Sequence, residues 1–158
     1  MCGIVGWIDF EQDVSLQRSI LESMTDTLAC RGPDDCGYWF SQHAAIGHRR
    51  LIVIDPEGGK QPMVRNRASH QFVLTYNGEL YNTEDLRQEL KSFGHRFQGY
   101  SDTEVLLVAY MQWGDRCLEK LNGIFAFAVW DEEKQQLFLA RDRVGIKPLF
   151  YARRGSSF

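Results

Sequence analysis

The second residue of the chain is a cysteine, followed by a glycine and a short apolar run (MCGIVGWI). Removal of Met1 is favoured when the next residue is small, and it would leave a thiol and a free α-amine on Cys2. An α-amine has an ordinary pKa of about 7.7–8.0 and a thiol one of about 8.5, so the amine can accept the thiol proton near neutral pH. Cys2 could therefore be a nucleophile with its own base, with Gly3 leaving room for a substrate carbonyl. By position alone, a small apolar residue in a first strand is the more common explanation.

Two motifs could supply donors or a cation to a site around Cys2. In YNGELYN, the Asn77–Gly78 pair is most often a tight hairpin turn. A side-chain amide beside a glycine N–H could instead stabilise a developing oxyanion. In HRRLIVID, Arg49 and Arg50 enter a strand and must point to opposite faces, so one can face a pocket and bind a carboxylate.

The motif SDTE has the pattern of a helix-capping box, with Ser101 as N-cap and Glu104 three residues later. Asp102 then lies in the first helical turn, where the helix dipole favours a carboxylate. That carboxylate could also hold a substrate ammonium.

Metal and disulfide sites are not indicated. The cysteines contain no CxxC spacing, and the histidines are not grouped; these residues are Cys2, Cys30, Cys36, Cys117, His43, His48, His70 and His95. We expect reduced thiols and no bound metal.

Hydrophobic periodicity and turn residues predict the elements that must position these side chains. Strands are expected at 2–9, 36–41, 44–48, 51–55, 71–77, 124–131 and 137–142, with a turn and one more strand within 145–152. Helices are expected at 16–28, 83–93 and 101–113, with a short helical piece at 115–121. Because the helices are separated from meandering strands, the order predicts an α+β fold with mostly antiparallel sheets.

Composition limits the classes of function. A chain of 158 residues with 44% hydrophobic residues is expected to form one domain with its own core. A net charge of −3 provides no basic face for nucleic acid or a membrane surface. The apolar run near the N-terminus is too short for a signal peptide and lacks a positive leader. We therefore expect a cytoplasmic protein without nucleic-acid or membrane partners.

Taken together and in order, the motifs resemble a known family. CGIVGW, RGPDDCG, HRRLIVID, YNGELYN, SDTEVLL, LNGIFAFAVWD and ARDRVGIKPLFYA are similar to the N-terminal glutaminase domain of glutamine-hydrolysing asparagine synthetases. These are class II (N-terminal-nucleophile, Ntn) glutamine amidotransferases, and the resemblance extends from Cys2 to about Ala152. It implies a four-layer αββα sandwich of two mostly antiparallel sheets. It also implies hydrolysis of L-glutamine to L-glutamate and ammonia through a γ-glutamyl thioester.

The resemblance also assigns roles to individual residues. It makes Cys2 the nucleophile, with Asn77 and Gly78 as the oxyanion hole. It makes Arg50, with backbone groups around Leu51 and Val53, the site of the glutamine α-carboxylate, and Glu79 and Asp102 the acids that receive the α-ammonium.

Beyond the glutaminase part, nothing in the sequence resembles the ATP-pyrophosphatase loop of the synthetase half. The closing ARRGSSF looks like an interrupted strand. We therefore expect residues 1–158 to be a fragment that lacks a C-terminal synthetase domain, on which alone ATP and Mg²⁺ would bind, and a homodimer is possible. Two alternatives stay open: a domain that feeds another acceptor (a sugar, a peptide-like substrate or a lactam), and a non-catalytic Ntn-fold scaffold or regulatory domain.

Overall fold

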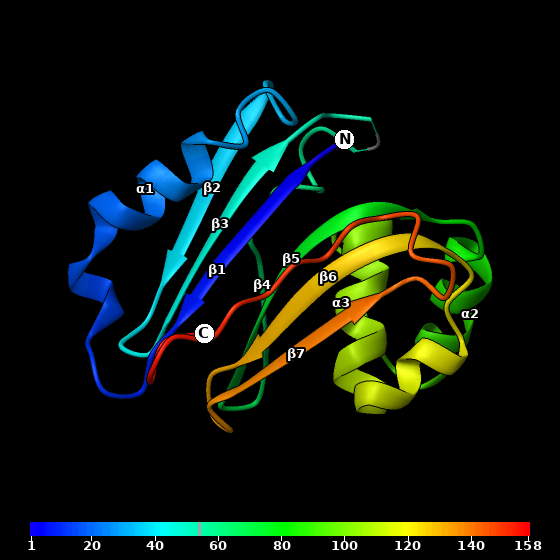
Figure 1. Ribbon diagram of the computed structural model, residues 1–158. Helices are drawn as coiled ribbons and strands as arrows, with labels where there is room; N and C mark the ends of the chain where they lie inside the picture. The colour runs from blue at the N-terminus through cyan, green and yellow to red at the C-terminus, as the bar shows by residue number, and fades with distance from the viewer. Residues whose placement is uncertain (54) are drawn as a thin grey trace.

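The computed structural model describes residues 1–53 and 55–158. Its first sheet has the strand order β1-β3-β2, with all pairs antiparallel. These strands are β1 (Gly3–Ile8), β2 (Asp35–Phe40) and β3 (Ala44–Arg50). A 3₁₀ turn, η1 (Val14–Leu16), and α1 (Arg18–Asp26) follow β1, and α1 covers the outer face of this sheet (Figure 1).

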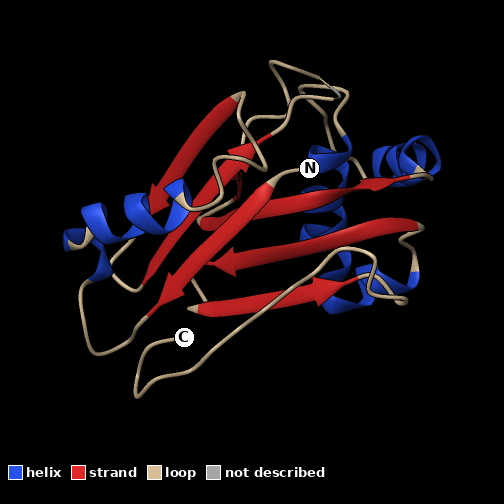
Figure 2. Ribbon diagram, turned by 45° about the horizontal axis from the view of Figure 1, so that its top comes forward, coloured by secondary structure: helices blue, strands red, loops and turns tan. Residues whose placement is uncertain are grey.

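The second sheet has the order β4-β5-β6-β7 and is also antiparallel. Its strands are β4 (Met63–Arg67), β5 (His70–Leu80), β6 (Gly123–Asp131) and β7 (Gln136–Arg141). The helices α2 (Thr83–Ser92) and α3 (Asp102–Trp113) and the 3₁₀ segment η2 (Gly114–Glu119) follow β5, and they pack on the outer face of this sheet (Figures 1 and 2). The layers are therefore helix, sheet, sheet and helix, and the predicted α+β sandwich is confirmed.

Alternation along β5 places its side chains in two different parts of the core. On one side of β5, Leu74 and Tyr76 pack with Leu106 and other residues of α3, a helix that is buried almost all round. On the other side, Val73 packs between the two sheets with Ile46 and Trp130. Even-numbered residues of this part of β5 thus face α3, and odd-numbered residues face the first sheet. Only the odd-numbered side chains can contact residues of β1 or β3.

Two expected strands are wrong. The strand predicted over 51–55 does not form because the N–H groups after Arg50 bond outside a ladder: Leu51 donates to Cys2 Sγ (3.4 Å) and Ile52 to Asp34 Oδ2 (2.8 Å). Residue 54 lies outside the described part of the chain. The strand predicted within 145–152 is also absent, because the N–H groups of Ile146 and Lys147 bond the Asp142 carboxylate and Pro148 has no N–H to donate.

One strand, β4, is missing from the sequence prediction. Of its residues only Met63 is buried, so it shows no apolar alternation, as is common for an edge strand. The predicted first helix also differs: Asp13 caps η1 through the Ser15 N–H, and α1 itself begins at Arg18.

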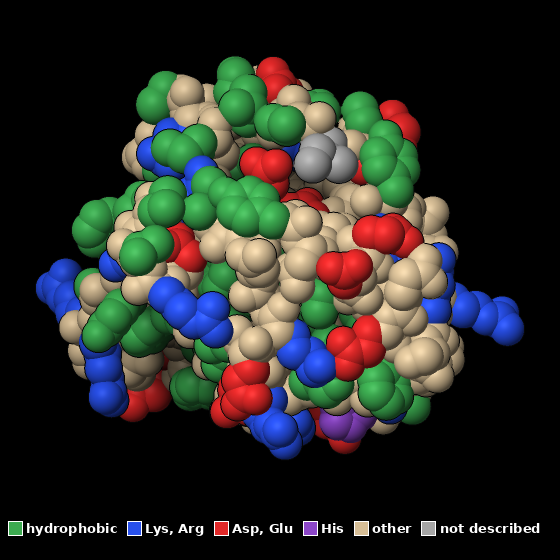
Figure 3. All heavy atoms as spheres, turned by 90° about the vertical axis from the view of Figure 1, so that its right-hand side faces the viewer, with side chains coloured by type: hydrophobic (Ala, Val, Ile, Leu, Met, Phe, Trp, Pro, Cys, Tyr) green, Lys and Arg blue, Asp and Glu red, His purple; other side chains and the backbone are tan. Residues whose placement is uncertain are grey.

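On the face shown in Figure 3, basic side chains are interspersed with acidic and hydrophobic ones. Among the described helices, none combines the length and apolar character needed to cross a membrane. After β7 the chain returns to β1, where Ile8 and Phe158 exchange two backbone hydrogen bonds of 2.9 and 2.8 Å (Figure 2).

Candidate active site

Cys2 lies directly before β1, at a cavity of about 210 Å³ where the first sheet meets the second. Its thiol is half-buried and contacts Leu51, accepting from the N–H (3.4 Å) and donating to the carbonyl oxygen (3.7 Å). Arg31 Nε donates to the Cys2 carbonyl oxygen (3.3 Å), which fixes the backbone behind the thiol. Gly3 also has a packing role: a Cβ there would lie 2.7 Å from Leu28 Cβ, so the missing side chain makes room for the turn that follows α1.

Asn77 and Gly78 lie within β5, so the hairpin-turn interpretation of this pair is wrong. They pair with Ala126 and Phe125 of β6. Asn77 is buried, and none of the hydrogen bonds among the described residues uses its side-chain amide. A Cβ on Gly78 would lie 2.3 Å from the Ile124 carbonyl oxygen, so only glycine fits beside β6 here.

The Gly78 N–H is free of the β5–β6 ladder. Phe125, opposite Gly78, directs both backbone groups to Asp142: its N–H donates to Oδ2 (3.2 Å) and its carbonyl accepts from the Asp142 N–H (2.7 Å). In an antiparallel pair of this type, both residues point their polar groups away from each other, so Gly78 points its N–H away from β6. The β4–β5 register ends at the Met63–Leu74 pair, so no described strand covers that side, and Gly78 lines the cavity.

The neighbouring N–H groups on this edge of β5 are satisfied by side chains. The Tyr76 N–H donates to Gln61 Oε1 (2.6 Å), and Gln61 Nε2 returns a bond to the Tyr76 carbonyl (3.1 Å). The Leu80 N–H donates to Asp102 Oδ2 (3.2 Å). Gly78 lies between these two positions, with an N–H available to a ligand. Gln61 was not identified from the sequence. This residue precedes β4, and its side chain makes the hydrogen bonds to Tyr76 that a neighbouring strand would otherwise make.

Arg49 and Arg50 point to opposite faces of β3, as alternation predicts. Arg49 pairs with Asp26 on the side of α1. Arg50 is 4% exposed and faces the cavity, where it donates to the carbonyl oxygens of Asp55 and Pro56 (2.7 Å each). These two bonds fix the guanidinium in the cavity wall.

The Asp55 carboxylate ties the loop after β3 to the start of α3. It accepts from the N–H groups of Gly58 (2.8 Å), Tyr100 (2.9 Å) and Ser101 (3.1 Å). Burial acts to raise the pKa of Asp55, but these donors and the charge of Arg50 outweigh it, so the pKa lies below its ordinary value. The ionised carboxylate therefore links the segment that holds Arg50 to the helix that carries Asp102.

The capping box that positions Asp102 is only half formed. Ser101 Oγ accepts from the Glu104 N–H (3.3 Å), as predicted. The Glu104 carboxylate does not return a bond to Ser101; it accepts from the N–H groups of Gln98 (2.7 Å) and Gly99 (2.8 Å) and pairs with Arg65.

Asp102 and Glu79 supply two carboxylates to the cavity. Asp102 is buried, and its Oδ2 accepts from the Tyr76 hydroxyl (2.8 Å) as well as from Leu80 N–H. Burial, then the charge of Asp102 and the hydrogen bond to it, raise the pKa of Tyr76 well above its ordinary value, so the hydroxyl stays a donor. Glu79 is exposed at the rim, and no hydrogen bond or ion pair among the described residues engages its carboxylate.

All eight predicted site residues line this one cavity; they are Cys2, Arg50, Leu51, Val53, Asn77, Gly78, Glu79 and Asp102. The structure brings them together, while their individual roles stay predictions. Val53 is largely exposed at the rim. The Leu51 N–H donates to the Cys2 thiol. To contact a substrate carboxylate as predicted, it would have to give up this hydrogen bond.

His48 and the other cysteines lie apart from the cavity lining. Burial, then the charge of Arg50, lowers the pKa of His48 to about 3, and its Nδ1 lies 3.0 Å from Thr75 Oγ1, so a neutral imidazole links the two sheets. Burial raises the pKa of the Cys117 thiol to about 12. All four cysteines are free, and no group of metal-binding side chains occurs among the described residues.

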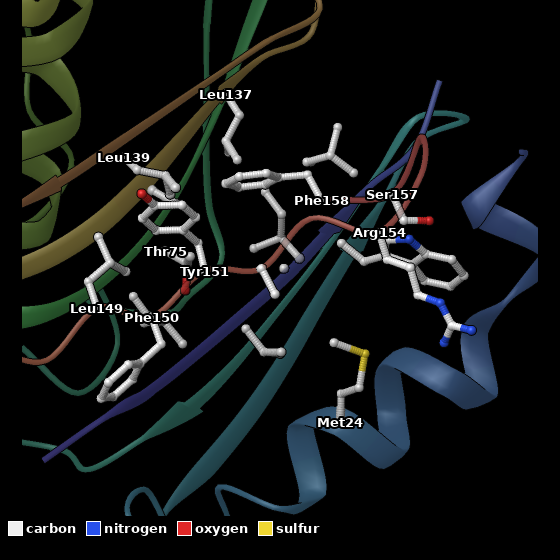
Figure 4. Close-up of a pocket in the computed structure, with 18 of the residues that line it drawn as sticks. Met24, Thr75, Leu137, Leu139, Leu149, Phe150, Tyr151, Arg154, Ser157 and Phe158 are labelled. Atoms are coloured by element: carbon white, nitrogen blue, oxygen red, sulfur yellow. The ribbon is translucent and has the colours of Figure 1, made fainter. Parts of the chain in front are cut away.

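A larger cavity of about 680 Å³ lies along β1, between the sheets and the C-terminal segment (Figure 4). Its lining is mainly apolar, including Leu137, Leu139, Tyr151 and Phe158. None of the predicted site residues lines it.

Comparison with known proteins decides the family. The sequence model of the family described as glutamine amidotransferase domain matches residues 1–158. The chain belongs to this family. Its fold is shared with the glutamine phosphoribosylpyrophosphate amidotransferase from B. subtilis, at a TM-score of 0.75 and 23% identity over 99% of this chain and 40% of that one. A second solved structure, the allosteric regulatory enzyme of purine biosynthesis, has a TM-score of 0.62 and 31% identity over 75% of this chain and 27% of that one. The predicted Ntn-hydrolase sandwich is confirmed.

Among curated relatives of this amidotransferase domain, asparagine synthetase [glutamine-hydrolyzing] 3 of Bacillus subtilis is 54% identical over the full chain. Asparagine synthetase B of Escherichia coli is 40% identical over 95% of the chain. Amidase chry2 of Gibberella zeae is 42% identical over 96%. The chain spans only 26%, 26% and 24% of these proteins, respectively, about a quarter of their length.

Proposed function

We propose that this glutamine amidotransferase domain hydrolyses L-glutamine to L-glutamate and ammonia through a γ-glutamyl thioester on Cys2. One observation carries the proposal. A thiol at the second position, two oxyanion donors, a buried arginine and two carboxylates all line one cavity of about 210 Å³. This set matches the reacting amide and both charged groups of a single glutamine molecule.

The chemistry begins when Met1 is removed. The new α-amine of Cys2 accepts the thiol proton, and the thiolate attacks the side-chain amide carbon of glutamine. The Asn77 amide and the Gly78 N–H donate to the oxyanion of the tetrahedral intermediate. When the intermediate collapses, the C–N bond breaks, and the proton held by the amine leaves with ammonia. The amine then accepts a proton from water, whose oxygen attacks the thioester and releases glutamate and the thiol.

Recognition of the substrate uses the charged residues of the cavity. The Arg50 guanidinium faces the glutamine α-carboxylate, and backbone groups near Leu51 and Val53 complete that subsite. Asp102 and Glu79 face the α-ammonium. These opposite charges fix both ends of the α-amino-acid group and leave only the amide directed at Cys2.

A labelling experiment tests this proposal. Treatment with an electrophilic glutamine analogue should add one adduct, mapped to Cys2, in protein that has lost Met1. Cys2→Ser should abolish the adduct and ammonia release, while the control Cys30→Ser, which removes an exposed free thiol, should retain both. Unchanged ammonia release by Cys2→Ser would overturn the proposal.

For the longer protein, we propose that this domain supplies ammonia to a C-terminal synthetase that uses ATP and Mg²⁺, in a cytoplasmic enzyme that forms asparagine. The 54% identity to a Bacillus subtilis asparagine synthetase supports this. We propose that residues outside this domain select the acceptor, because Arg50, Glu79 and Asp102 of the cavity are all assigned to glutamine. The test is to supply full-length protein with glutamine, ATP and aspartate and to measure asparagine, with size-exclusion chromatography reporting whether it is a homodimer.

A further inference from the structure

Lys147 lines the cavity but has no part in the proposed mechanism. The residue is 8% exposed and lines the same cavity as Cys2. Its Nζ lies 3.0 Å from the sulfur of Met1. The ammonium is thus held against the residue that must leave before the proposed chemistry begins.

The loop after β7 fixes this lysine through its backbone. The buried Asp142 carboxylate accepts from the N–H groups of Lys147 (2.9 Å) and Ile146 (2.8 Å), and also from Phe125 of β6 (3.2 Å). Burial acts to raise the pKa of Asp142, but these backbone donors outweigh it and lower the pKa. An ionised Asp142 therefore anchors the loop to β6 and holds Lys147 at the cavity.

The ammonium of Lys147 has no anionic partner in the described part of the chain. None of the ion pairs there includes it. The Met1 thioether is a weak acceptor, and a buried ammonium without a good partner is costly. Removal of Met1 takes away this contact and creates an α-amine on the adjacent residue.

The distance between the two nitrogen atoms is limited by covalent geometry. One methionine side chain and one peptide bond separate the Met1 sulfur from the Cys2 nitrogen, so Lys147 Nζ lies within roughly 10 Å of that nitrogen. At such a distance in a partly buried site, a positive charge lowers the pKa of an amine by about one pH unit.

We propose that Lys147 is a positioning residue whose ammonium faces the α-amine of Cys2 after Met1 leaves and holds that amine neutral, ready to accept a proton. This rests on the proposed glutaminase function. Other charges around Cys2 have separate partners or tasks. Arg31 donates to the Cys2 carbonyl, Arg50 to two backbone carbonyls, and the acids Glu79 and Asp102 face the substrate ammonium.

The test compares three variants, each produced with Cys2 at the N-terminus by cleavage of a leader, so that processing of Met1 is not a variable. Lys147→Met removes the charge and keeps the length, and Lys147→Arg keeps the charge. Lys91→Met removes an exposed lysine of α2 and controls for net charge. The measurements are the pH dependence of kcat/KM for glutamine hydrolysis and the titration of the Cys2 Cα resonance in ¹³C-cysteine-labelled protein.

In Lys147→Met the acidic limb of the pH profile and the Cys2 amine titration should both move up by about one pH unit, which lowers kcat/KM about tenfold below that pKa and little above it. Lys147→Arg and Lys91→Met should keep the wild-type profile. An unchanged amine titration in Lys147→Met, or an equal loss of activity at every pH, would overturn the inference. If wild-type protein released no ammonia, the proposed function would fail, while the amine titration would still decide the role of Lys147.

Discussion

Replacement of Asn77 by alanine isolates one donor of the proposed oxyanion hole. The Asn77 amide makes no hydrogen bond to the described residues, so its removal breaks no native bond and should change the free energy of unfolding by about 1 kcal/mol or less. Loss of one preorganised oxyanion donor typically lowers kcat by about 10²–10³, or about 2.7–4 kcal/mol of transition-state stabilisation. Because the donor acts on the oxyanion and not on the bound amide, kcat and kcat/KM should fall together with little change in KM.

The assay is steady-state release of ammonia, with thermal unfolding followed on the same samples. Asn66→Ala, which removes an exposed asparagine of β4, is the matched control and should keep wild-type kcat. Intact mass must show that Met1 is absent from both variants. A kcat for Asn77→Ala within threefold of wild type would refute the oxyanion assignment, and a similar loss in Asn66→Ala would show that the effect is not specific to the cavity.

Three further predictions concern the buried His48, the cavity carboxylate Asp102 and the tightly packed Gly3. Acidification from pH 7 to pH 4.5 should lower the free energy of unfolding with a slope approaching about 1.4 kcal/mol per pH unit, because burial lowers the pKa of His48 to about 3 and only the unfolded chain takes up that proton. Urea titrations measure it, and His48→Gln should lose this slope while His95→Gln keeps it. Asp102→Asn should raise KM for glutamine about tenfold with a smaller change in kcat; an equal fall in kcat at unchanged KM would contradict its role in binding the ammonium. Gly3→Ala should lower the free energy of unfolding by about 1–3 kcal/mol, because its Cβ would lie 2.7 Å from Leu28 Cβ, and an unchanged melting temperature would argue against it.

Local patterns in the sequence predicted most elements because they report burial. The apolar runs of β1 and β6 and the cap at Ser101 were sufficient for this. The edge strand β4 could not be predicted in the same way, since it buries little and its pairing with β5 is a tertiary contact. Nor could the end of β3 at Arg50, which depends on hydrogen bonds to a cysteine and an aspartate distant in sequence.

For the site, the sequence predicted which eight residues share a cavity, but not the secondary structure that holds Asn77 and Gly78 or the further lining residues Gln61 and Lys147. The Asn77–Gly78 pair has the local signal of a turn, and only the pairing with β6 shows that it lies inside a long strand. Gln61 gives no local signal, because its role is to bond an edge of β5 that β4 leaves uncovered. The position of Lys147 beside Met1 could not be predicted either, because it depends on how the loop after β7 folds against the N-terminus.

The segment Arg50–Leu51 couples the proposed site of substrate recognition to the proposed nucleophile. Arg50 is the last residue of β3, and its guanidinium is fixed by the carbonyls of Asp55 and Pro56. The next residue, Leu51, holds the Cys2 thiol from both its N–H and its carbonyl. A carboxylate bound at Arg50 must therefore lie within one residue of the backbone that orients the sulfur, and a shift of this segment would displace both groups together. Because Asp55 also bonds the N–H groups at the start of α3, the helix that carries Asp102 is held to the same segment. The proposed carboxylate subsite, ammonium subsite and nucleophile are thus connected through one short loop, although they come from different layers of the sandwich.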